Sequence, residues 1–219
     1  MRLYIYAAGD EKLLGAHDKD GNRTDKFRAV NTVVLPAGDL SELHSGLSRL
    51  VREGKTFRHV LWSTHGSPGY LKFGAQGLTS RVLREQFAGN GYERLFPQSA
   101  KMYFAGCNVA GDTECNGACP PGGVNKGWTF LETIGRVFLH GGGYTVGWTS
   151  YGYGLDWRPS RLLYTSHMVH FSGDVRHVLF LPGGVPYERL SYDGALWSGD
   201  GINQARIGAR LYSLVPPSV

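Results

Sequence analysis

The sequence predicts an α/β fold built on a mostly parallel sheet, and three observations lead to this expectation. Over residues 2–149, short apolar segments alternate with segments whose apolar residues recur at helical spacing. Two of the apolar segments, 59–64 and 101–106, stop abruptly at His65 and Cys107, as buried parallel strands do. Glycine supplies 32 of the 219 residues, in small clusters without a fixed period that fit tight turns between elements.

Five segments are expected to be strands because they are short, rich in apolar residues and bounded by turn residues. They cover residues 2–8, 31–35, 57–63, 101–105 and 144–149. The second is expected to end at Pro36, because proline cannot donate a hydrogen bond to a neighbouring strand. Residues 9–30 are polar and predict a loop, and residues 70–74 predict one arm of a small hairpin.

Three helices are expected between these strands because leucine, valine and aromatic residues recur there at helical spacing. They cover residues 40–51, 82–87 and 128–139. Asp39 is a suitable N-cap for the first helix, and Thr79 or Ser80 for the second. Each helix is followed by glycine, which commonly ends helices. This alternation of strands and helices implies helices on both faces of the sheet.

After Ser150 the pattern changes to apolar segments separated by Gly, Asp and Pro turns. Strands are expected at 162–171, 175–181 and 187–191, and helical spacing recurs only at 202–211. We therefore expect residues 156–219 to form a β-rich extension of the domain whose core is 1–155. A small accessory subdomain is the alternative.

Charge and composition narrow the expected partners. The net charge is +5, but the basic residues are scattered and form no stripe, so nucleic acid is not an expected partner. There is no apolar stretch of about 18 residues and no signal-peptide pattern, so no membrane partner is expected. Three cysteines do not make a disulfide framework, and a cytoplasmic location is expected.

Ligands of parallel sheets bind just beyond the carboxyl ends of the strands, where His65 and Cys107 are expected. An adjacent imidazole can take the proton of a thiol to make a nucleophilic thiolate, and can later protonate a leaving amine. The backbone N–H groups of Gly66 and Cys107 are expected to hold an oxyanion. Taken singly, each residue also fits a structural role, as a buried cysteine or a histidine in a turn.

Other motifs suggest no cofactor. Cys115 and Cys119 form a C-x₃-C pair, but a structural zinc needs four ligands, so His17 or His140 would have to complete the set with Cys107. No metal is therefore expected, and the pair is expected to be a local disulfide or two thiols.

Residues 106–113 partly mimic a phosphate-binding loop, but Asp112 stands where that motif requires lysine, so no nucleotide is expected. His167 and His170 would point to opposite faces of a strand, so a metal shared with His177 is not expected either.

The order of these features resembles the caspase–haemoglobinase group of cysteine peptidases, in which a strand ending in His-Gly precedes a strand ending in Cys. Two local motifs are also similar to a caspase-like domain family of large bacterial surface proteins. They are His-Gly-Ser-Pro-Gly at 65–69, followed by Leu71 and Gly74, and Gly-Cys-Asn-Val-Ala-Gly at 106–111. The resemblance covers about residues 1–155.

The resemblance implies a caspase-like three-layer sandwich and a bacterial-type cysteine endopeptidase. It implies that His65 is the general base, that Cys107 is the nucleophile, and that the backbone of Gly66 and Cys107 forms the oxyanion hole. It also implies a peptide or protein substrate, bound by a pocket that segment 146–151 helps to form. The substrate-binding residues implied in that segment are Trp148, Thr149, Ser150 and Tyr151.

The chain departs from the caspase signature Gln-Ala-Cys-Arg-Gly, because Cys107 stands in Phe-Ala-Gly-Cys-Asn-Val-Ala. Aspartate specificity is therefore not implied. The Gly- and Pro-rich insertion at 108–126 is peculiar to this chain and is interpreted as a lid or, since it carries Lys126, a self-cleaved loop. Two alternatives to a peptidase stay open: a non-catalytic interaction module that keeps the same sheet, and another thiol hydrolase or acyltransferase with the same dyad.

Overall fold

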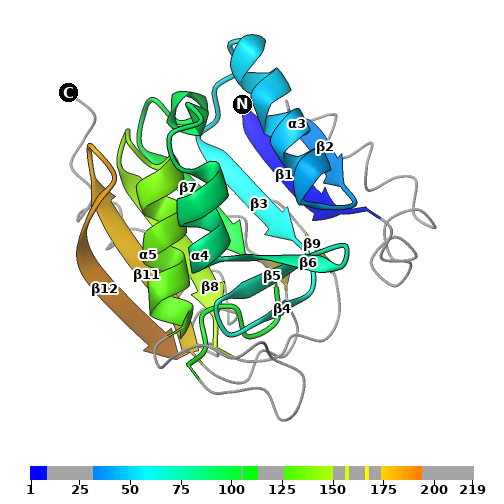
Figure 1. Cartoon of the computed structure of the whole chain (residues 1–219). Helices are drawn as coiled ribbons and strands as arrows, with labels where there is room; N and C mark the ends of the chain where they lie inside the picture. Colours follow the sequence, from blue (N-terminus) through cyan, green and yellow to red (C-terminus); the bar gives the residue numbers. More distant parts are fainter. Residues whose placement is uncertain are drawn as a thin grey trace.

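The computed structural model describes residues 1–8, 32–104, 106–112, 126–149, 156–157, 166–167 and 174–193. Its centre is a seven-stranded sheet in the order β12-β11-β8-β7-β3-β1-β2 (Figure 1). In chain order these strands are β1 Arg2–Ala7, β2 Thr32–Ala37, β3 His59–Ser63, β7 Ala100–Phe104, β8 Gly143–Trp148, β11 Asp174–Leu181 and β12 Val185–Asp193. The four pairs that join β2, β1, β3, β7 and β8 are all parallel, which confirms the α/β class and the mostly parallel sheet.

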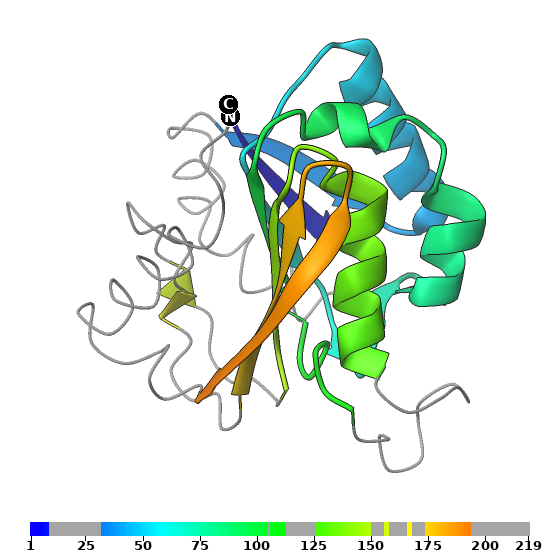
Figure 2. The same cartoon turned by 90° about the vertical axis from the view of Figure 1, so that its left-hand side faces the viewer.

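Three helices pack on one face of this sheet (Figure 2). They are α3 Leu40–Arg52, α4 Ser80–Val82, which continues as the π-helical turn η1 Leu83–Phe87, and α5 Lys126–Phe138; a 3₁₀ turn, η2, covers Tyr92–Leu95. These are the three helices that the sequence predicts. Helices on the second face are not found in the described residues, so that layer of the sandwich stays a prediction.

The predicted helix caps are confirmed. The Asp39 carboxylate accepts a hydrogen bond from the N–H of Glu42 at 2.8 Å, at the start of α3. The Thr79 hydroxyl does the same for Val82 at 3.2 Å, at the start of α4. Each cap satisfies one of the N–H groups that a helix leaves without an internal partner, so both helices begin at the expected residues.

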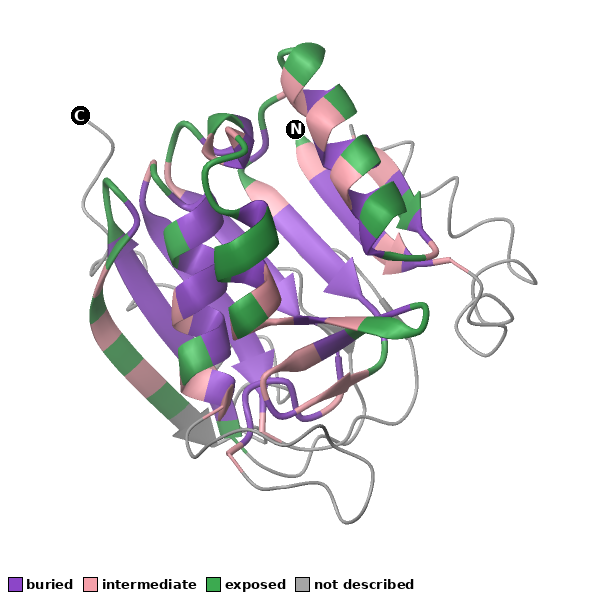
Figure 3. Ribbon diagram, viewed as in Figure 1, coloured by how far each residue is buried: buried purple, intermediate pink, exposed green. Residues whose placement is uncertain are grey.

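The core between the helices and the sheet is rich in aromatic rings. Trp62 of β3 lies with its ring centre 6.1 Å from that of Phe104 on β7 and 6.1 Å from that of Phe138 on α5. All three residues are buried, and Figure 3 shows that β3, which carries Trp62, is buried along most of its length. Burying one such side chain contributes about 2–3 kcal/mol, so this core fixes β3 and β7 firmly beside each other.

The expected end of the second strand at Pro36 is wrong, because β2 runs through Pro36 to Ala37. Pro36 lies opposite Tyr6 of β1, and the N–H of Ala8 donates to the carbonyl of Ala37 at 2.9 Å. Because β2 is the last strand of the described sheet on this side, the missing proline N–H leaves no neighbouring strand without a donor.

The tail of the chain adds two strands to the sheet. β11 pairs antiparallel with β8, and β12 pairs antiparallel with β11, which confirms the strands predicted at 175–181 and 187–191. Of the strand predicted at 162–171 only β10, Ser166–His167, is described, and it pairs with β9, Asp156–Trp157. The predicted loop at 9–30 and helical segment at 202–211 lie outside the described residues.

The face of the sheet opposite the helices carries buried titratable groups. The hydroxyls of Tyr103 and Tyr144 lie 2.9 Å apart, and the ring of His177 lies 5.8 Å from that of Tyr144. Burial lowers the pKa of His177 to about 3. Burial, together with the positive charge of Lys101, lowers the pKa of His59 to about 4. Both imidazoles are therefore neutral at neutral pH.

Acid is expected to destabilise the fold through these two histidines. In the unfolded chain an imidazole takes up its proton near pH 6.5, whereas folded His177 does so only near pH 3. The contribution of these two histidines to the free energy of unfolding is therefore complete above pH 6.5. As the pH is lowered below that value, this contribution falls by about 1.4 kcal/mol per pH unit for each histidine. We expect His177→Phe to lose roughly half of this slope between pH 6 and pH 4, as urea unfolding would measure. Equal slopes in both proteins would contradict this role of His177.

Candidate active site

The two strands that end at the predicted catalytic residues are neighbours in the sheet. β3 and β7 are parallel, with His59 opposite Lys101 and Trp62 opposite Phe104. If the same register continued beyond the strand ends, His65 would lie opposite Cys107, because paired residues are 42 positions apart in both cases. Both residues therefore leave the sheet at its carboxyl edge, where parallel sheets bind ligands.

The backbones that follow the two strands touch each other. A β-carbon on Gly66 would lie 2.9 Å from the carbonyl oxygen of Cys107 and 2.9 Å from the Cα of Gly106. A β-carbon on Gly106 would lie 3.2 Å from the Cα of Gly66. Real β-carbons do not approach backbone this closely, so glycine at both positions allows the His65 and Cys107 segments to meet.

A small three-stranded sheet holds the histidine segment. It consists of β4 Gly66–Ser67, β5 Tyr70–Phe73 and β6 Gln76–Thr79, and it extends the single hairpin arm that the sequence predicts. The carbonyl of His65 accepts a hydrogen bond from the N–H of Lys72 at 2.8 Å, and the buried Thr64 hydroxyl donates to the carbonyl of Lys72. The backbone around His65 is therefore fixed, while its side chain is exposed.

The chain turns sharply after Cys107, which is a half-buried thiol. Asn108 has a φ of 54°, in the left-handed region that non-glycine residues rarely adopt, and its carbonyl accepts a hydrogen bond from the N–H of Gly111 at 2.9 Å. Its side chain is buried, and Oδ1 has no hydrogen-bond partner among the described residues. Asparagine adopts this region more readily than other non-glycine residues, because its short side chain can hydrogen-bond locally.

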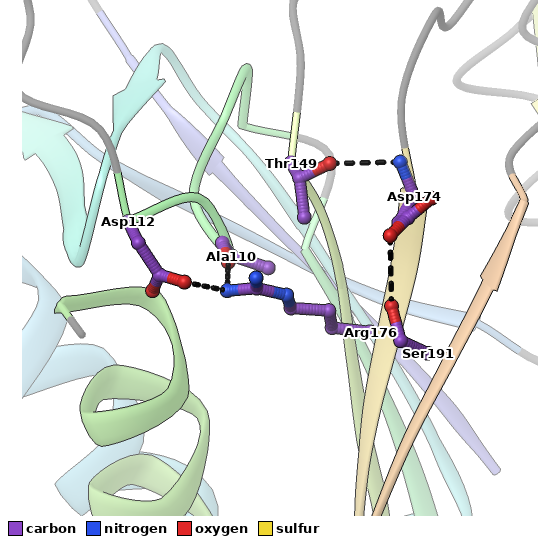
Figure 4. Close-up of polar contacts among 6 residues, drawn as sticks. All are labelled: Ala110, Asp112, Thr149, Asp174, Arg176 and Ser191. Atoms are coloured by element: carbon purple, nitrogen blue, oxygen red, sulfur yellow. Dashed lines mark hydrogen bonds and ion pairs between the residues drawn. The ribbon is translucent and has the colours of Figure 1, made fainter.

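The contacts that maintain this turn come from four separate elements. Three of these contacts are hydrogen bonds between backbone groups. The carbonyl of Val109 accepts from the N–H of Gly69 at 3.0 Å, and the N–H of Ala110 donates to the carbonyl of Trp148 at 2.9 Å. The carbonyl of Gly111 accepts from the N–H of Gly127 at 3.1 Å. The fourth partner is a side chain: Nη1 of Arg176 donates to the carbonyl of Ala110 at 2.8 Å (Figure 4). The same nitrogen forms an ion pair with Asp112 at 2.7 Å.

The sequence did not indicate this arginine. In the sequence, Asp112 argues only against a phosphate-binding loop, and Arg176 lies on β11, far away in the chain. Its partner at Ala110 is a backbone carbonyl. Every residue has such a carbonyl, so the type of residue at position 110 does not predict the contact. The only available signal was the position of Arg176 in an apolar strand, where a charged residue needs a partner.

The predicted substrate-binding segment forms hydrogen bonds within the chain. Trp148 is buried. The N–H of Thr149 donates to the carbonyl of Asp174 at 2.9 Å, and its hydroxyl accepts from the N–H of Asp174 at 2.8 Å (Figure 4). Ser150 and Tyr151 lie outside the described residues, so a substrate-binding role for this segment stays a prediction.

The residues weighed as zinc ligands are mostly outside the described residues as well, as Cys115, Cys119 and His17 are. Nε2 of His140 lies 3.0 Å from the carbonyl of Arg136, one turn earlier in the chain. Within the described ranges, no group of three or more His, Cys, Asp or Glu side chains is placed to hold a metal ion. No helix in the same ranges is long and apolar enough to cross a membrane.

This arrangement provides an exposed imidazole, a half-buried thiol and closely packed glycine backbone at one edge of the sheet. An imidazole and a thiol are the two side chains that thiolate attack on an acyl carbon uses, with proton transfer by the imidazole. The sequence matches no model of a known protein family, and a search of curated proteins likewise finds no match.

Proposed function

We propose that this chain is a cysteine endopeptidase of caspase-like fold, in which His65 and Cys107 form the catalytic dyad. The observation that carries the proposal is the parallel register of β3 and β7, continued into the contact between Gly66 and the Gly106–Cys107 backbone. It is supported by the tight turn at Asn108, which directly follows Cys107 and is closed by the hydrogen bond from the Gly111 N–H to the Asn108 carbonyl.

In the proposed reaction the His65 imidazole takes the proton of the Cys107 thiol, and the thiolate attacks the carbonyl carbon of the scissile peptide bond. The backbone N–H groups of Gly66 and Cys107 stabilise the oxyanion, which is typically worth about 3 kcal/mol for each donor. When the C–N bond breaks, His65 protonates the leaving amine and the acyl group remains as a thioester on Cys107. Water, deprotonated by His65, then hydrolyses the thioester and restores the thiol.

The proposed substrate is a peptide or protein, and the proposed location is the cytoplasm, where a reducing environment keeps Cys107 as a thiol.

Competitive alkylation tests the activated thiol directly. With limiting iodoacetamide at neutral pH, followed by peptide mapping, we expect Cys107 to be modified faster than Cys115, Cys119 and free N-acetylcysteine, because a neighbouring base increases its thiolate fraction. Cleavage-site profiling on a proteome-derived peptide library, with Cys107→Ala as the control, then identifies the substrate residue preferred. Slow and uniform labelling of all three cysteines, at the rate of free cysteine, would be incompatible with the proposal.

One observation favours a second candidate, a non-catalytic interaction module. The backbone of Trp148 and Thr149, expected to pair with substrate, is already bonded to Ala110 and Asp174. The two candidates differ in turnover. The peptidase consumes peptides that the Cys107→Ala protein binds without cleaving, whereas the interaction module leaves the bound peptide intact in both proteins.

A further inference from the structure

Arg176 makes an unusual set of contacts for a residue in a sheet strand. Its Nη1 bonds both to the Ala110 carbonyl and to the Asp112 carboxylate, and its guanidinium lies 4.8 Å from the ring centre of Trp128 on α5. Its side chain is 17% exposed, and its Nε is buried without a hydrogen-bond partner in the described part of the chain. Figure 4 shows it reaching from β11 across to the turn that follows Cys107.

A charged side chain held this far from water is costly unless its partners compensate it. A surface position would give Asp112 a counter-charge at less cost, so stability alone does not explain the arrangement. The second partner, the Ala110 carbonyl, belongs to the turn that fixes the backbone of Cys107. Of the contacts described above to residues 109–111, this is the one made by a side chain; the others come from backbone N–H and carbonyl groups.

We propose that Arg176 is a positioning residue for Cys107, acting through the Ala110 carbonyl and the Asp112 carboxylate. The inference rests on the proposed dyad and adds a third, remote residue to it. By holding Ala110 from the β11 side, Arg176 keeps the left-handed Asn108 turn closed and keeps Cys107 in register with His65. A displacement of about 1 Å in a reacting group can lower a rate by about 10²-fold, so loss of this contact acts on the chemistry.

The chain offers a matched control in Arg189. Its guanidinium lies over the same Trp128 ring at 5.4 Å and pairs with Glu132 at 2.7 Å, but it is 50% exposed and has no recorded contact with residues 106–112. Arg176→Met and Arg189→Met therefore remove the same charge, the same cation–ring contact and one ion pair each. They differ in the contact with the Cys107 turn, and Arg176 is also the more buried of the two side chains.

The experiment measures the rate of Cys107 alkylation by iodoacetamide relative to N-acetylcysteine, in protein shown to be folded by circular dichroism. Wild type, Arg176→Met, Arg176→Lys and Arg189→Met are compared, and kcat and KM are measured on a peptide identified by profiling. We expect Arg176→Met to lower the Cys107 rate and kcat at least tenfold with KM within about twofold. Arg176→Lys keeps the charge and one nitrogen donor, so its Cys107 rate and kcat should lie between those of wild type and Arg176→Met. The Cys107 rate and kcat of Arg189→Met should equal those of wild type.

A Cys107 rate in folded Arg176→Met within twofold of that in Arg189→Met overturns the inference and leaves the dyad intact. If Arg176→Met does not fold, Arg176→Lys decides: a rate at least threefold below wild type supports the inference, and a smaller change overturns it. Failure of the dyad itself is a different result, in which wild-type Cys107 already reacts no faster than N-acetylcysteine.

Discussion

Cys107→Ala and His65→Ala are each expected to lower kcat by at least about 10⁴-fold, because nucleophile and base act as a unit and loss of either stops the covalent step. The fold is expected to survive both changes. The His65 side chain is exposed and that of Cys107 is half-buried, and substitutions at such positions usually change stability by about 0.5 kcal/mol. Peptide turnover and thermal unfolding, measured on the same samples, check the two halves of this prediction.

Control variants at other histidines and cysteines show whether a loss of turnover is specific to His65 and Cys107. His140→Ala removes another exposed histidine, one placed after α5 and ahead of β8, at the opposite end of the parallel strands from Cys107. Cys115→Ala and Cys119→Ala remove the other two thiols. All three variants should keep wild-type turnover. Turnover in His65→Ala equal to that in His140→Ala would remove His65 from the mechanism.

The parts of the fold that the sequence predicts correctly are those set by local physics. The leucines of α3 recur at helical spacing behind Asp39, and both the cap and the spacing act within a few residues. The carboxyl ends of β3 and β7, just before His65 and Cys107, could be located for the same reason, because an apolar segment followed by glycine is a local signal. The predicted meeting of these two ends needed only the rule that parallel strands present their carboxyl ends at one edge.

The features missed depend on neighbours that are distant in the sequence. Pro36 is compatible with a strand only because β2 has no further neighbour in the described sheet, and a sequence does not state which strand is outermost. The contact of Arg176 with Ala110 depends on β11 pairing antiparallel with β8, and its acceptor is a backbone atom. The pattern of residue types therefore predicts neither the outermost position of β2 nor the contact between Arg176 and Ala110.

Gly66→Ala is expected to damage both the site and the fold. The new methyl group would lie 2.9 Å from the Cys107 carbonyl oxygen and 2.9 Å from the Cα of Gly106. Both are backbone atoms that cannot rotate away, so the two strand ends must separate. Overpacking of this kind typically costs about 1–3 kcal/mol, and the separation moves His65 away from Cys107. We expect kcat/KM to fall about 10²-fold or more, together with a lower urea midpoint of unfolding.

Gly38→Ala provides the matched control for that change. Gly38 directly follows the parallel strand β2, whereas Gly66 lies three residues after the end of the parallel strand β3; both are half-buried and neither has a positive φ. Its added β-carbon would first meet Oε2 of Glu42 at 3.2 Å, the end of a flexible side chain that can move. Stability and activity should therefore stay near wild type. Both substitutions add the same methyl group beyond the carboxyl end of a parallel strand. Equal activity in both variants would mean that close packing of the His65 and Cys107 segments is not needed for catalysis.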